Sequence, residues 1–339
     1  MRTFRFDSLG GIDDLALHQE PIPEPQRGEV LVKVHAVSLN RRDILMVQGN
    51  YPGAVSAGLI PCSDAAGEIV AVGEGVTAFE SGDRVINTFH PRWFGAQPPR
   101  SVADETYGNR RDGWLTEYKV VSQEALVSLP DDLSWEEGST LPCAGVTAWN
   151  ALFGRSPVLP GQTVLTLGSG SVSLFAIQLA KAAGAAVIGT TSREAKEEAL
   201  QKLGVDCVVN YSRIEEWGKY IKDETTQGLG ADIVVETGGS TTLANSLEAV
   251  GLEGEVVLIG QQEGDSEGFE FSQLKKNRAT IRSIGVGHRA MLENLVRAIQ
   301  VNRIEPVVDG LFAFEESREA FHRLESGVPF GKIVLRLDT

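Results

Sequence analysis

The stretch from Val164 to Arg193, VLTLGSGSVSLFAIQLAKAAGAAVIGTTSR, constrains the fold more than any other part of the 339-residue chain. It reads as an apolar strand, a glycine-containing turn, an amphipathic helix and a second apolar strand. That succession is typical of a parallel sheet that binds a phosphate group where its first strand meets its first helix. The usual Gly-x-Gly-x-x-Gly pattern is incomplete, because Ser173 replaces the third glycine. Serine is still small enough to let the helix lie close to the strand.

The two remaining glycines have separate tasks in the predicted site. Gly168 allows a tight turn, and Gly170 lets the backbone approach a pyrophosphate closely. The helix expected from about Val172 directs its free N–H groups and the positive end of its dipole at that anion. We therefore predict a dinucleotide site whose turn comprises Gly168, Ser169, Gly170, Ser171 and Val172.

The residues after the second strand indicate which dinucleotide is bound. An NAD-specific site normally places Asp or Glu there to accept both ribose hydroxyls, and this chain has neither. The candidate residues are Thr191, Ser192, Arg193 and, one helical turn later, Lys196. A hydrogen bond from arginine or lysine to a 2′-phosphate is worth about 1.5–3 kcal/mol, so NADP(H) is favoured over NAD(H). The alternative interpretation is that Arg193 and Lys196 only begin a solvated helix.

Strand-like segments divide the chain into two parts with different patterns. Up to about residue 127, alternating runs such as EVLVKVHAVSL, GEIVAVGEGV and GDRVINTF predict an antiparallel, barrel-like domain. After a helical connection that begins at Ser134, apolar strands alternate with helices and predict a doubly wound parallel sheet. The six strands are expected at 163–167, 186–190, 207–210, 232–236, 255–260 and 280–285. The fold class is thus α/β, with residues 1–127 and a returning segment, 302–339, in one domain and residues 128–301 in the other.

The charge of the chain argues against two kinds of partner. A formal net charge of −15 repels nucleic acid and anionic lipid, which bind through clustered positive charge. The first residues, MRTFRFDSLGG, lack the apolar core of a signal peptide, and no window offers about 18 consecutive apolar residues. We therefore expect a cytoplasmic protein without nucleic-acid or membrane partners, whose three cysteines are reduced.

Five segments resemble one known family from end to end: VSLNRRDILMVQGNYP, GEIVAVGEGVTAFESGDRV, LPCAGVTAW, GSGSVSLFAIQLAKAAGA and the final FGKIVLRL. They are similar to the medium-chain dehydrogenase/reductase superfamily, in particular to its zinc-free quinone oxidoreductase-like and alcohol dehydrogenase-like branch. The resemblance implies a GroES-like β-barrel catalytic domain, a Rossmann domain and an active site between them. It also implies a homodimer in which the strand near 280–285 extends the sheet across the two-fold axis.

Zinc-dependent members of that superfamily bind the metal through a cysteine, the histidine of a Gly-His-Glu motif and a second cysteine. The resemblance places Asn40 and Ser63 at the first two of these positions, so that only Cys143 remains. A catalytic zinc needs three protein ligands, and we therefore predict a site without metal. The alternative ligand set of Cys62, Asp64 and Cys143 stays open.

Without a metal, hydrogen-bond donors must stabilise the negative charge that hydride transfer builds on an oxygen. The resemblance places Asn40, Asp43 and Tyr51 at the cleft as candidate catalytic residues. Tyr51 is expected to donate a hydrogen bond or a proton to the reduced oxygen, and Asn40 to orient substrate or cofactor as an uncharged donor. The alternative for Tyr51 is a core aromatic residue with a satisfied hydroxyl.

On the cofactor side, the resemblance puts Thr147 beside the nicotinamide ring and makes Arg289 and Lys332 candidate cofactor contacts. The alternative for both cations is an ordinary surface position. These features together predict an NADP(H)-dependent, metal-free oxidoreductase that transfers hydride between nicotinamide and a quinone, enone or aldehyde/ketone. The alternatives are a zinc-dependent alcohol dehydrogenase and a non-catalytic NADPH-binding protein.

Overall fold

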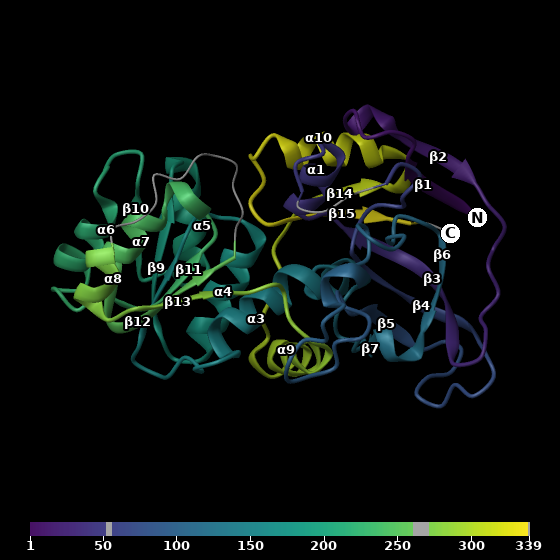
Figure 1. The fold of residues 1–339 in the computed structure, drawn as a ribbon, viewed down its shortest axis with the longest axis horizontal. Coiled ribbons are helices and arrows are strands. Elements are labelled where there is room, and N and C mark those ends of the chain that lie inside the picture. Colours follow the sequence, from purple (N-terminus) through teal and green to yellow (C-terminus); the bar gives the residue numbers. More distant parts are fainter. Residues whose placement is uncertain (52–55, 260–270, 338–339) are drawn as a thin grey trace. The chain divides into compact units, whose positions relative to one another are not determined.

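The computed structural model describes residues 1–51, 56–259 and 271–337, with the backbone alone for residues 103 and 104. The chain forms two compact units. Unit 1 comprises Met1–Val146 and Gly287–Thr339, and unit 2 comprises Thr147–Val286. In Figure 1 the purple N-terminal strands and the yellow C-terminal strands accordingly lie in the same unit. Residues 128–146 and 287–301, which the sequence pattern groups with the parallel sheet, lie in unit 1 in this division.

Unit 2 contains a six-stranded parallel sheet with the strand order β10-β9-β8-β11-β12-β13. Its strands are β8 (Thr163–Thr166), β9 (Ala186–Thr191), β10 (Cys207–Asn210), β11 (Ala231–Glu236), β12 (Val250–Leu258) and β13 (Thr280–Ser283). Each predicted strand corresponds to one of these, which confirms the doubly wound sheet. The start of β12 was predicted too late, at Glu255 instead of Val250, because β12 pairs with β11 at Val250 before its register shifts.

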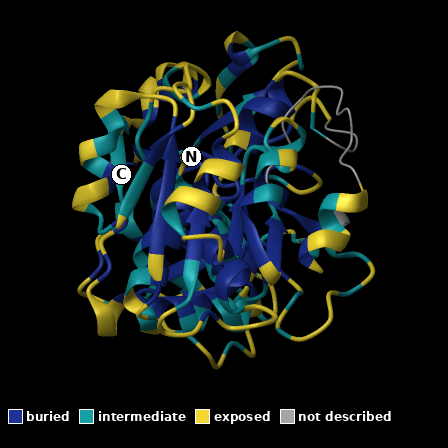
Figure 2. Cartoon of the chain, turned by 90° about the vertical axis from the view of Figure 1, so that its left-hand side faces the viewer, coloured by how far each residue is buried: buried dark blue, intermediate teal, exposed yellow. Residues whose placement is uncertain are grey.

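The helices of unit 2 connect these strands in the order expected for crossover units. They are α3 (Val146–Phe153), α4 (Ser171–Ala182), α5 (Glu197–Lys202), α6 (Trp217–Tyr220), α7 (Leu243–Ala249) and α8 (Phe271–Asn277). The strands are apolar on both faces because helices cover both, and Leu165, Val234 and Val256 are fully buried. Figure 2 shows strands in dark blue and exposed yellow faces on helices.

The strand order reverses between β8 and β11, because the chain leaves β8 for β9 on one side and later returns to β11 on the other. In open α/β sheets, ligands bind outside the carboxyl ends of the strands at such a switch point. The glycine turn follows β8 at this edge. The topology therefore places the predicted phosphate turn where a dinucleotide is expected.

Unit 1 is built on a sheet with the order β14-β15-β3-β4-β5-β7, in which β6 also pairs with β3. The strands are β3 (Glu29–Ser38), β4 (Asp64–Val72), β5 (Arg84–Asn87), β6 (Tyr118–Ser122), β7 (Leu126–Ser128), β14 (Val308–Ala313) and β15 (Lys332–Arg336). All pairs are antiparallel except β14 with β15. A separate antiparallel pair is formed by β1 (Arg2–Phe6) and β2 (Leu15–Gln19). The expected antiparallel sheet of the first domain is thus confirmed.

The helices of unit 1 are α1 (Arg41–Val47), α2 (Trp135–Ser139), α9 (Arg289–Asn302) and α10 (Ser317–Glu325). The helix predicted from Ser134 is α2, which begins with a capping box: Glu137 N donates to Ser134 Oγ at 3.2 Å, and Ser134 N donates to Glu137 Oε2 at 2.8 Å. Ser38 Oγ of β3 donates to the carbonyl oxygen of Ser139 at 2.8 Å and so ties α2 to the antiparallel sheet. In the part of the chain described here, no helix combines the length and the apolarity needed to cross a membrane.

Candidate functional site

The predicted phosphate turn has the geometry of an open anion site. Gly168 adopts a φ of 69°, a left-handed conformation that favours glycine. A Cβ atom added at Gly168 or Gly170 would meet no protein atom within 4 Å, so the space beside the turn is free for a ligand. The helix α4 begins directly after its N-cap Gly170, and among the described residues no side-chain cap bonds to the N–H groups of its first turn. These groups remain available for a pyrophosphate, and the residues therefore fit a nicotinamide dinucleotide.

The replacement of the third glycine has a simple structural explanation. Ser173 is buried, and its hydroxyl donates to the carbonyl oxygen of Leu167, the residue before the turn, at 2.6 Å. Thr237, which follows β11, donates to the same carbonyl oxygen at 2.9 Å. The serine thus joins α4 to the end of β8 by a hydrogen bond where a glycine would join them by close packing alone.

The candidate 2′-phosphate residues gather at the carboxyl end of β9. Thr191 Oγ1 accepts a hydrogen bond from Arg193 N at 3.1 Å. Ser192 and Arg193 are exposed. Lys196 Nζ contacts Ser169 Oγ in the phosphate turn at 2.9 Å. The ammonium group of Lys196 therefore lies against the turn itself, in contrast to the solvated helix start considered as the alternative. Two cationic residues thus lie at the edge where β8 and β9 end.

The candidate catalytic residue Asn40 and the candidate cofactor contact Lys332 meet where three strands of unit 1 run side by side. The register pairs Ser38 of β3 with Asp64 of β4 and with Val334 of β15. Asn40 follows β3 and precedes α1, while Lys332 is the first residue of β15. The sheet therefore brings Asn40, Asp64 and Lys332 together from distant parts of the sequence.

These three side chains form one hydrogen-bond network. Lys332 Nζ donates to Asn40 Oδ1 and to the carbonyl oxygen of Leu39, both at 2.8 Å. Asn40 Nδ2 donates to Asp64 Oδ2 at 3.0 Å, and Lys332 Nζ lies 3.7 Å from the same oxygen. Lys332 is 1% exposed and Asp64 is fully buried, so the network holds a buried ion pair. Lys332 is thus a core residue in this structure and not the surface cation considered above.

Asp64 also organises the two other positions at which zinc-dependent relatives have metal ligands. Its Oδ1 accepts from Ser63 Oγ at 2.6 Å, and its Oδ2 accepts from the backbone N–H of Cys143 at 3.1 Å. Cys143 lies in a π-helical turn, Leu141–Gly145. Burial, and next the Asp64 carboxylate, raise the pKa of the Cys143 thiol.

The donor set at this place does not fit zinc. Zinc is bound by thiolate, imidazole or carboxylate groups, and Asn40 and Ser63 supply an amide and a hydroxyl. The ammonium of Lys332 adds a positive charge beside Asp64, where it would repel a divalent cation. The described residues contain no group of three or more His, Cys, Asp or Glu side chains that could hold a metal ion, and this includes the alternative set with Cys62.

Cys62 has a backbone conformation that is uncommon outside glycine. Its φ is 69°, and the residue is fully buried. A Cβ atom at Gly108 or Gly113 would lie within 3 Å of the backbone at Cys62, so both glycines are required by the close approach of this loop. Tertiary packing against this loop therefore fixes the backbone at Cys62.

The remaining catalytic candidates have distinct surroundings. Asp43 is fully buried, and its Oδ2 accepts from Asn40 N at 2.7 Å, as in a helix cap. Burial raises the pKa of Asp43 to about 6. The Tyr51 ring centre lies 5.3 Å from the guanidinium carbon of Arg42, whose Nη1 donates to the carbonyl oxygen of Tyr107 at 3.0 Å. Within the described residues, Tyr51 is partly exposed and its hydroxyl makes no hydrogen bond.

The last two predicted cofactor contacts lie on helices. Thr147 is buried in α3 and belongs to unit 2. Arg289 begins α9 in unit 1, and it pairs with Glu124 and Glu293 at 3.0 Å each. Its backbone N–H donates to the carbonyl oxygen of Trp93 at 2.9 Å, which fastens the long loop 88–113 to α9. The structure thus gives Arg289 two carboxylate partners of its own, and its role as a cofactor contact stays a prediction.

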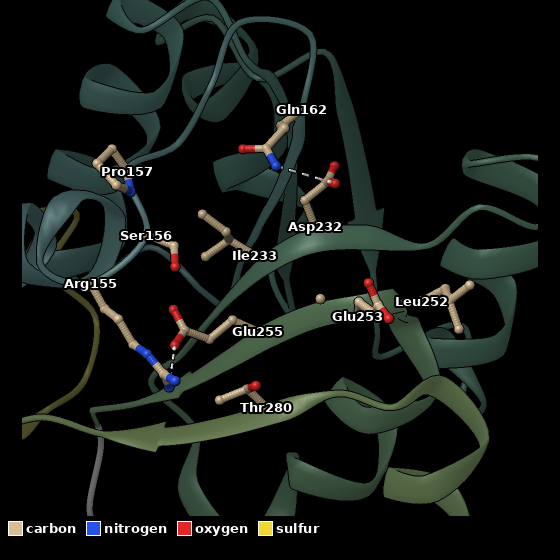
Figure 3. Close-up of a pocket in the computed structure, with 11 residues that line it drawn as sticks. Arg155, Ser156, Pro157, Gln162, Asp232, Ile233, Leu252, Glu253, Glu255 and Thr280 are labelled. Atoms are coloured by element: carbon tan, nitrogen blue, oxygen red, sulfur yellow. Dashed lines mark hydrogen bonds and ion pairs between the residues drawn. The ribbon is translucent and has the colours of Figure 1, made fainter.

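A polar pocket of about 200 Å³ lies at the opposite edge of the parallel sheet, where β8, β11, β12 and β13 begin. Figure 3 shows Arg155 directed at Glu255, 3.9 Å away, and Gln162 directed at Asp232, 3.5 Å away. The phosphate turn follows the carboxyl end of β8, so this pocket and the predicted dinucleotide site occupy opposite ends of the strands. None of the predicted site residues lines it, and we assign it no role in the reaction.

Two residues of these sites were missed as site members by the sequence reasoning. Asp64 was considered only as an alternative metal ligand, although it is the hub of the network in unit 1. Glu236 was noted only as the end of a strand, although it is fully buried and faces the loop after β11. The available signal was a carboxylate at one terminus of a mostly apolar strand: Asp64 is the first residue of β4, and Glu236 is the last residue of β11.

Comparison with known proteins extends the resemblance seen in the sequence. Residues 26–131 match the alcohol dehydrogenase GroES-like domain family, and residues 171–300 match the zinc-binding dehydrogenase family. A zinc-type alcohol dehydrogenase-like protein of Schizosaccharomyces pombe is 39% identical, and the match covers 100% of this chain and 99% of the relative. An acryloyl-coenzyme A reductase of Metallosphaera sedula is 31% identical over 92% of this chain and 93% of the relative.

The solved structures agree with these matches. The crystal structure of an NAD-dependent alcohol dehydrogenase superposes with a TM-score of 0.91 at 30% identity, covering 99% of each chain. The matches therefore include both units over nearly their whole length. The chain accordingly belongs to the medium-chain dehydrogenase/reductase superfamily, whose members are oxidoreductases that use nicotinamide cofactors.

Proposed function

We propose that this protein is an NADP(H)-dependent reductase that works without a metal and transfers hydride to a quinone, an enone or an aldehyde/ketone. The observation that carries the proposal is the buried Lys332–Asn40–Asp64 network at the place where zinc-dependent relatives bind their metal. This network satisfies the buried charges internally. The chain must then stabilise the developing oxyanion with hydrogen-bond donors.

The preference for NADP(H) rests on charge. A 2′-phosphate at the end of β9 would meet the exposed Arg193 and the ammonium of Lys196, which already lies 2.9 Å from Ser169 Oγ. No carboxylate stands in the segment Thr191–Arg193 to accept the ribose hydroxyls that an NAD site binds.

The proposed chemistry divides between cofactor and protein. The turn from Gly168 to Val172 would hold NADPH, which when bound would supply a hydride for the electrophilic carbon of the substrate. Tyr51 would donate a proton or hydrogen bond to the oxygen that receives the charge, because its hydroxyl is not engaged by other described residues. Asn40 would hold this region in place, since its amide oxygen accepts from Lys332 and its amide nitrogen donates to Asp64. Asp43 would act through Asn40, because Asp43 Oδ2 accepts a hydrogen bond from the backbone N–H of Asn40.

Three features support the substrate class. An enone, an enoyl thioester, a quinone or a carbonyl compound all place negative charge on an oxygen during reduction, which neutral donors can stabilise. The acryloyl-coenzyme A reductase relative acts on a conjugated carbonyl compound, as its name states. The loop 88–113, fastened to α9 by Trp93 and Phe94, carries aromatic rings suited to a planar substrate.

We further propose a homodimer that forms along β13. This strand is the last in the six-stranded sheet, and its residues are half-buried or exposed. An edge strand presents unpaired N–H and C=O groups that a second copy can pair. Light scattering coupled to gel filtration tests this: a mass of one chain, about 36.5 kDa, would contradict it.

Two measurements test the enzymatic proposal. Stopped-flow mixing of the protein and NADPH with a panel of quinones, enals, enoyl thioesters and ketones should show oxidation of NADPH with at least one acceptor. Binding of NADPH without turnover of any acceptor would favour a non-catalytic NADPH-binding protein. Elemental analysis of protein purified without chelator should show less than stoichiometric zinc, and one zinc per chain would overturn the metal-free assignment.

A further inference from the structure

Glu236 is a buried carboxylate that no part of the proposed reaction uses. It ends β11 and is fully buried. Its Oε1 accepts from the backbone N–H groups of Gly238 at 2.6 Å and Gly239 at 3.0 Å, and from Thr242 Oγ1 at 2.6 Å. Its Oε2 accepts from Ser246 Oγ on α7. Four donors from the following loop and helix therefore point at one carboxylate.

The loop is shaped to enclose that carboxylate. A Cβ atom at Gly238 would lie 2.3 Å from Thr242 Oγ1, and Gly239 has a φ of 73°. Both positions therefore need glycine for the turn to close. Among the described residues Glu236 makes no salt bridge, so N–H and O–H dipoles alone compensate its buried charge. Hydrogen bonds to an ionised acceptor are about twice as strong as neutral ones, so these four bonds hold the loop and α7 to the end of β11.

The enclosed loop lies beside the predicted phosphate turn. Thr237 Oγ1 donates to the carbonyl oxygen of Leu167 at 2.9 Å, and Gly168 follows Leu167 directly. The strands β8 and β11 are neighbours in the sheet and flank its switch point. Residues 237–242 therefore follow the strand on the side of β8 away from β9, where the switch point predicts a ligand crevice.

We propose that Glu236 is a positioning residue for the dinucleotide, which holds the loop 237–242 as the wall for the nicotinamide half of the cofactor. The inference rests on the proposed function. If the 2′-phosphate of the adenosine half lies at the end of β9 and the pyrophosphate at the turn, the rest of the cofactor must extend towards β11. Glu236 touches no cofactor atom in this arrangement and acts through Thr237 and the turn.

The variant Glu236→Gln tests the proposal because it keeps the size of the side chain. Its amide oxygen can replace Oε1, and its amide nitrogen can donate to Ser246 Oγ in place of Oε2, so the variant keeps the contacts but removes the negative charge that strengthens them. We expect the Kd of NADPH, measured by fluorescence titration, to rise about 5-fold or more, the factor that the loss of one hydrogen bond represents. The Kd of adenosine 2′,5′-bisphosphate, which lacks the nicotinamide half, should stay within about 2-fold of the unchanged protein.

Two further variants complete the experiment. Glu248→Gln is the matched control, because Glu248 lies on α7 in the same unit but pairs with Lys276 at 3.2 Å; both Kd values should stay unchanged. Thr237→Val keeps the carboxylate and removes only the hydrogen bond to Leu167, so it decides the question if Glu236→Gln does not fold. Thr237→Val should likewise raise the Kd of NADPH and leave the Kd of the bisphosphate unchanged.

Two results would overturn the inference. Unchanged NADPH binding in Thr237→Val and in folded Glu236→Gln would show that the loop does not position the cofactor. Equal weakening of NADPH and the bisphosphate would show a general loss of structure in unit 2. If the unchanged protein bound neither compound, the proposed function would fail first and the inference with it. Measuring the binding of both compounds to the unchanged protein therefore distinguishes a failure of the proposed function from a failure of the inference about Glu236.

Discussion

Replacing Lys332 by methionine is expected to destabilise unit 1 by about 3–5 kcal/mol, the usual cost of removing one partner of a buried ion pair. Lys332 Nζ lies 3.7 Å from Asp64 Oδ2, and the two side chains are 1% and 0% exposed. At that distance and an effective dielectric constant of about 20, the attraction between the charges is about 4–5 kcal/mol. The methionine also leaves the carbonyl oxygen of Leu39 and Asn40 Oδ1 without the donor that now lies 2.8 Å from each.

The double variant Lys332→Met/Asp64→Asn separates the charge effect from lost packing. With both charges removed, no buried charge remains unpaired at this position, so the double variant should be less destabilised than the sum of the single variants by at least about 2 kcal/mol. Arg336→Met is the matched control on the same strand. Arg336 pairs with Glu136 at the surface, with half of its side chain exposed, and its loss should cost less than about 1 kcal/mol.

Urea unfolding gives the overall stability of these variants, and hydrogen exchange of the β3 and β15 amides reports on unit 1 alone. The exchange measurement is needed because a chain with two units need not unfold in one step. The reasoning would be refuted if the loss in free energy of unfolding in the double variant equalled the sum of the two single losses within about 0.5 kcal/mol. A Lys332→Met protein as stable as the unchanged one would also refute it, because the ion pair would then contribute nothing to the core.

Three further predictions concern other parts of the two sites. The double variant Arg193→Met/Lys196→Met should raise the Kd of NADPH at least about 10-fold in binding titrations and leave the Kd of NADH unchanged. An equal rise in both Kd values would contradict the 2′-phosphate assignment. Gly170→Ala should keep its urea midpoint, because φ is −74° and a Cβ meets open space. It should still weaken NADPH, since the methyl group occupies the place of the pyrophosphate, and unchanged binding would argue against that placement. Because burial raises the pKa of Asp43 from 3.8 to about 6, its contribution to stability is present below about pH 4 and is lost as the pH rises through 6. Asp43→Asn should therefore gain stability relative to the unchanged protein between pH 4 and 7 in urea titrations, and parallel pH profiles would contradict this.

Local patterns in the sequence predicted most of the strands and helices around the candidate sites. The strand, glycine turn and helix around Gly168 appear where the apolar periodicity and the turn residues placed them. The predicted strand starts at 163, 186, 207 and 280 match the structure, because period and turn chemistry are properties of a few neighbouring residues. The start of β12 was less accurate, because the bulge beside Ala231 depends on pairing with another strand.

The sequence by itself therefore determined the succession of elements, the family and the candidate phosphate turn. Only the tertiary structure decided what the polar residues do. Lys332 and Asn40 are 292 positions apart, and the pairing of β15 with β3 makes a predicted cofactor contact into a buried partner of Asp64. Glu236 likewise becomes the centre of a loop only when the donors after β11 fold back on it. Periodicity is local, whereas the partner of a buried charge is set by which strands and loops meet.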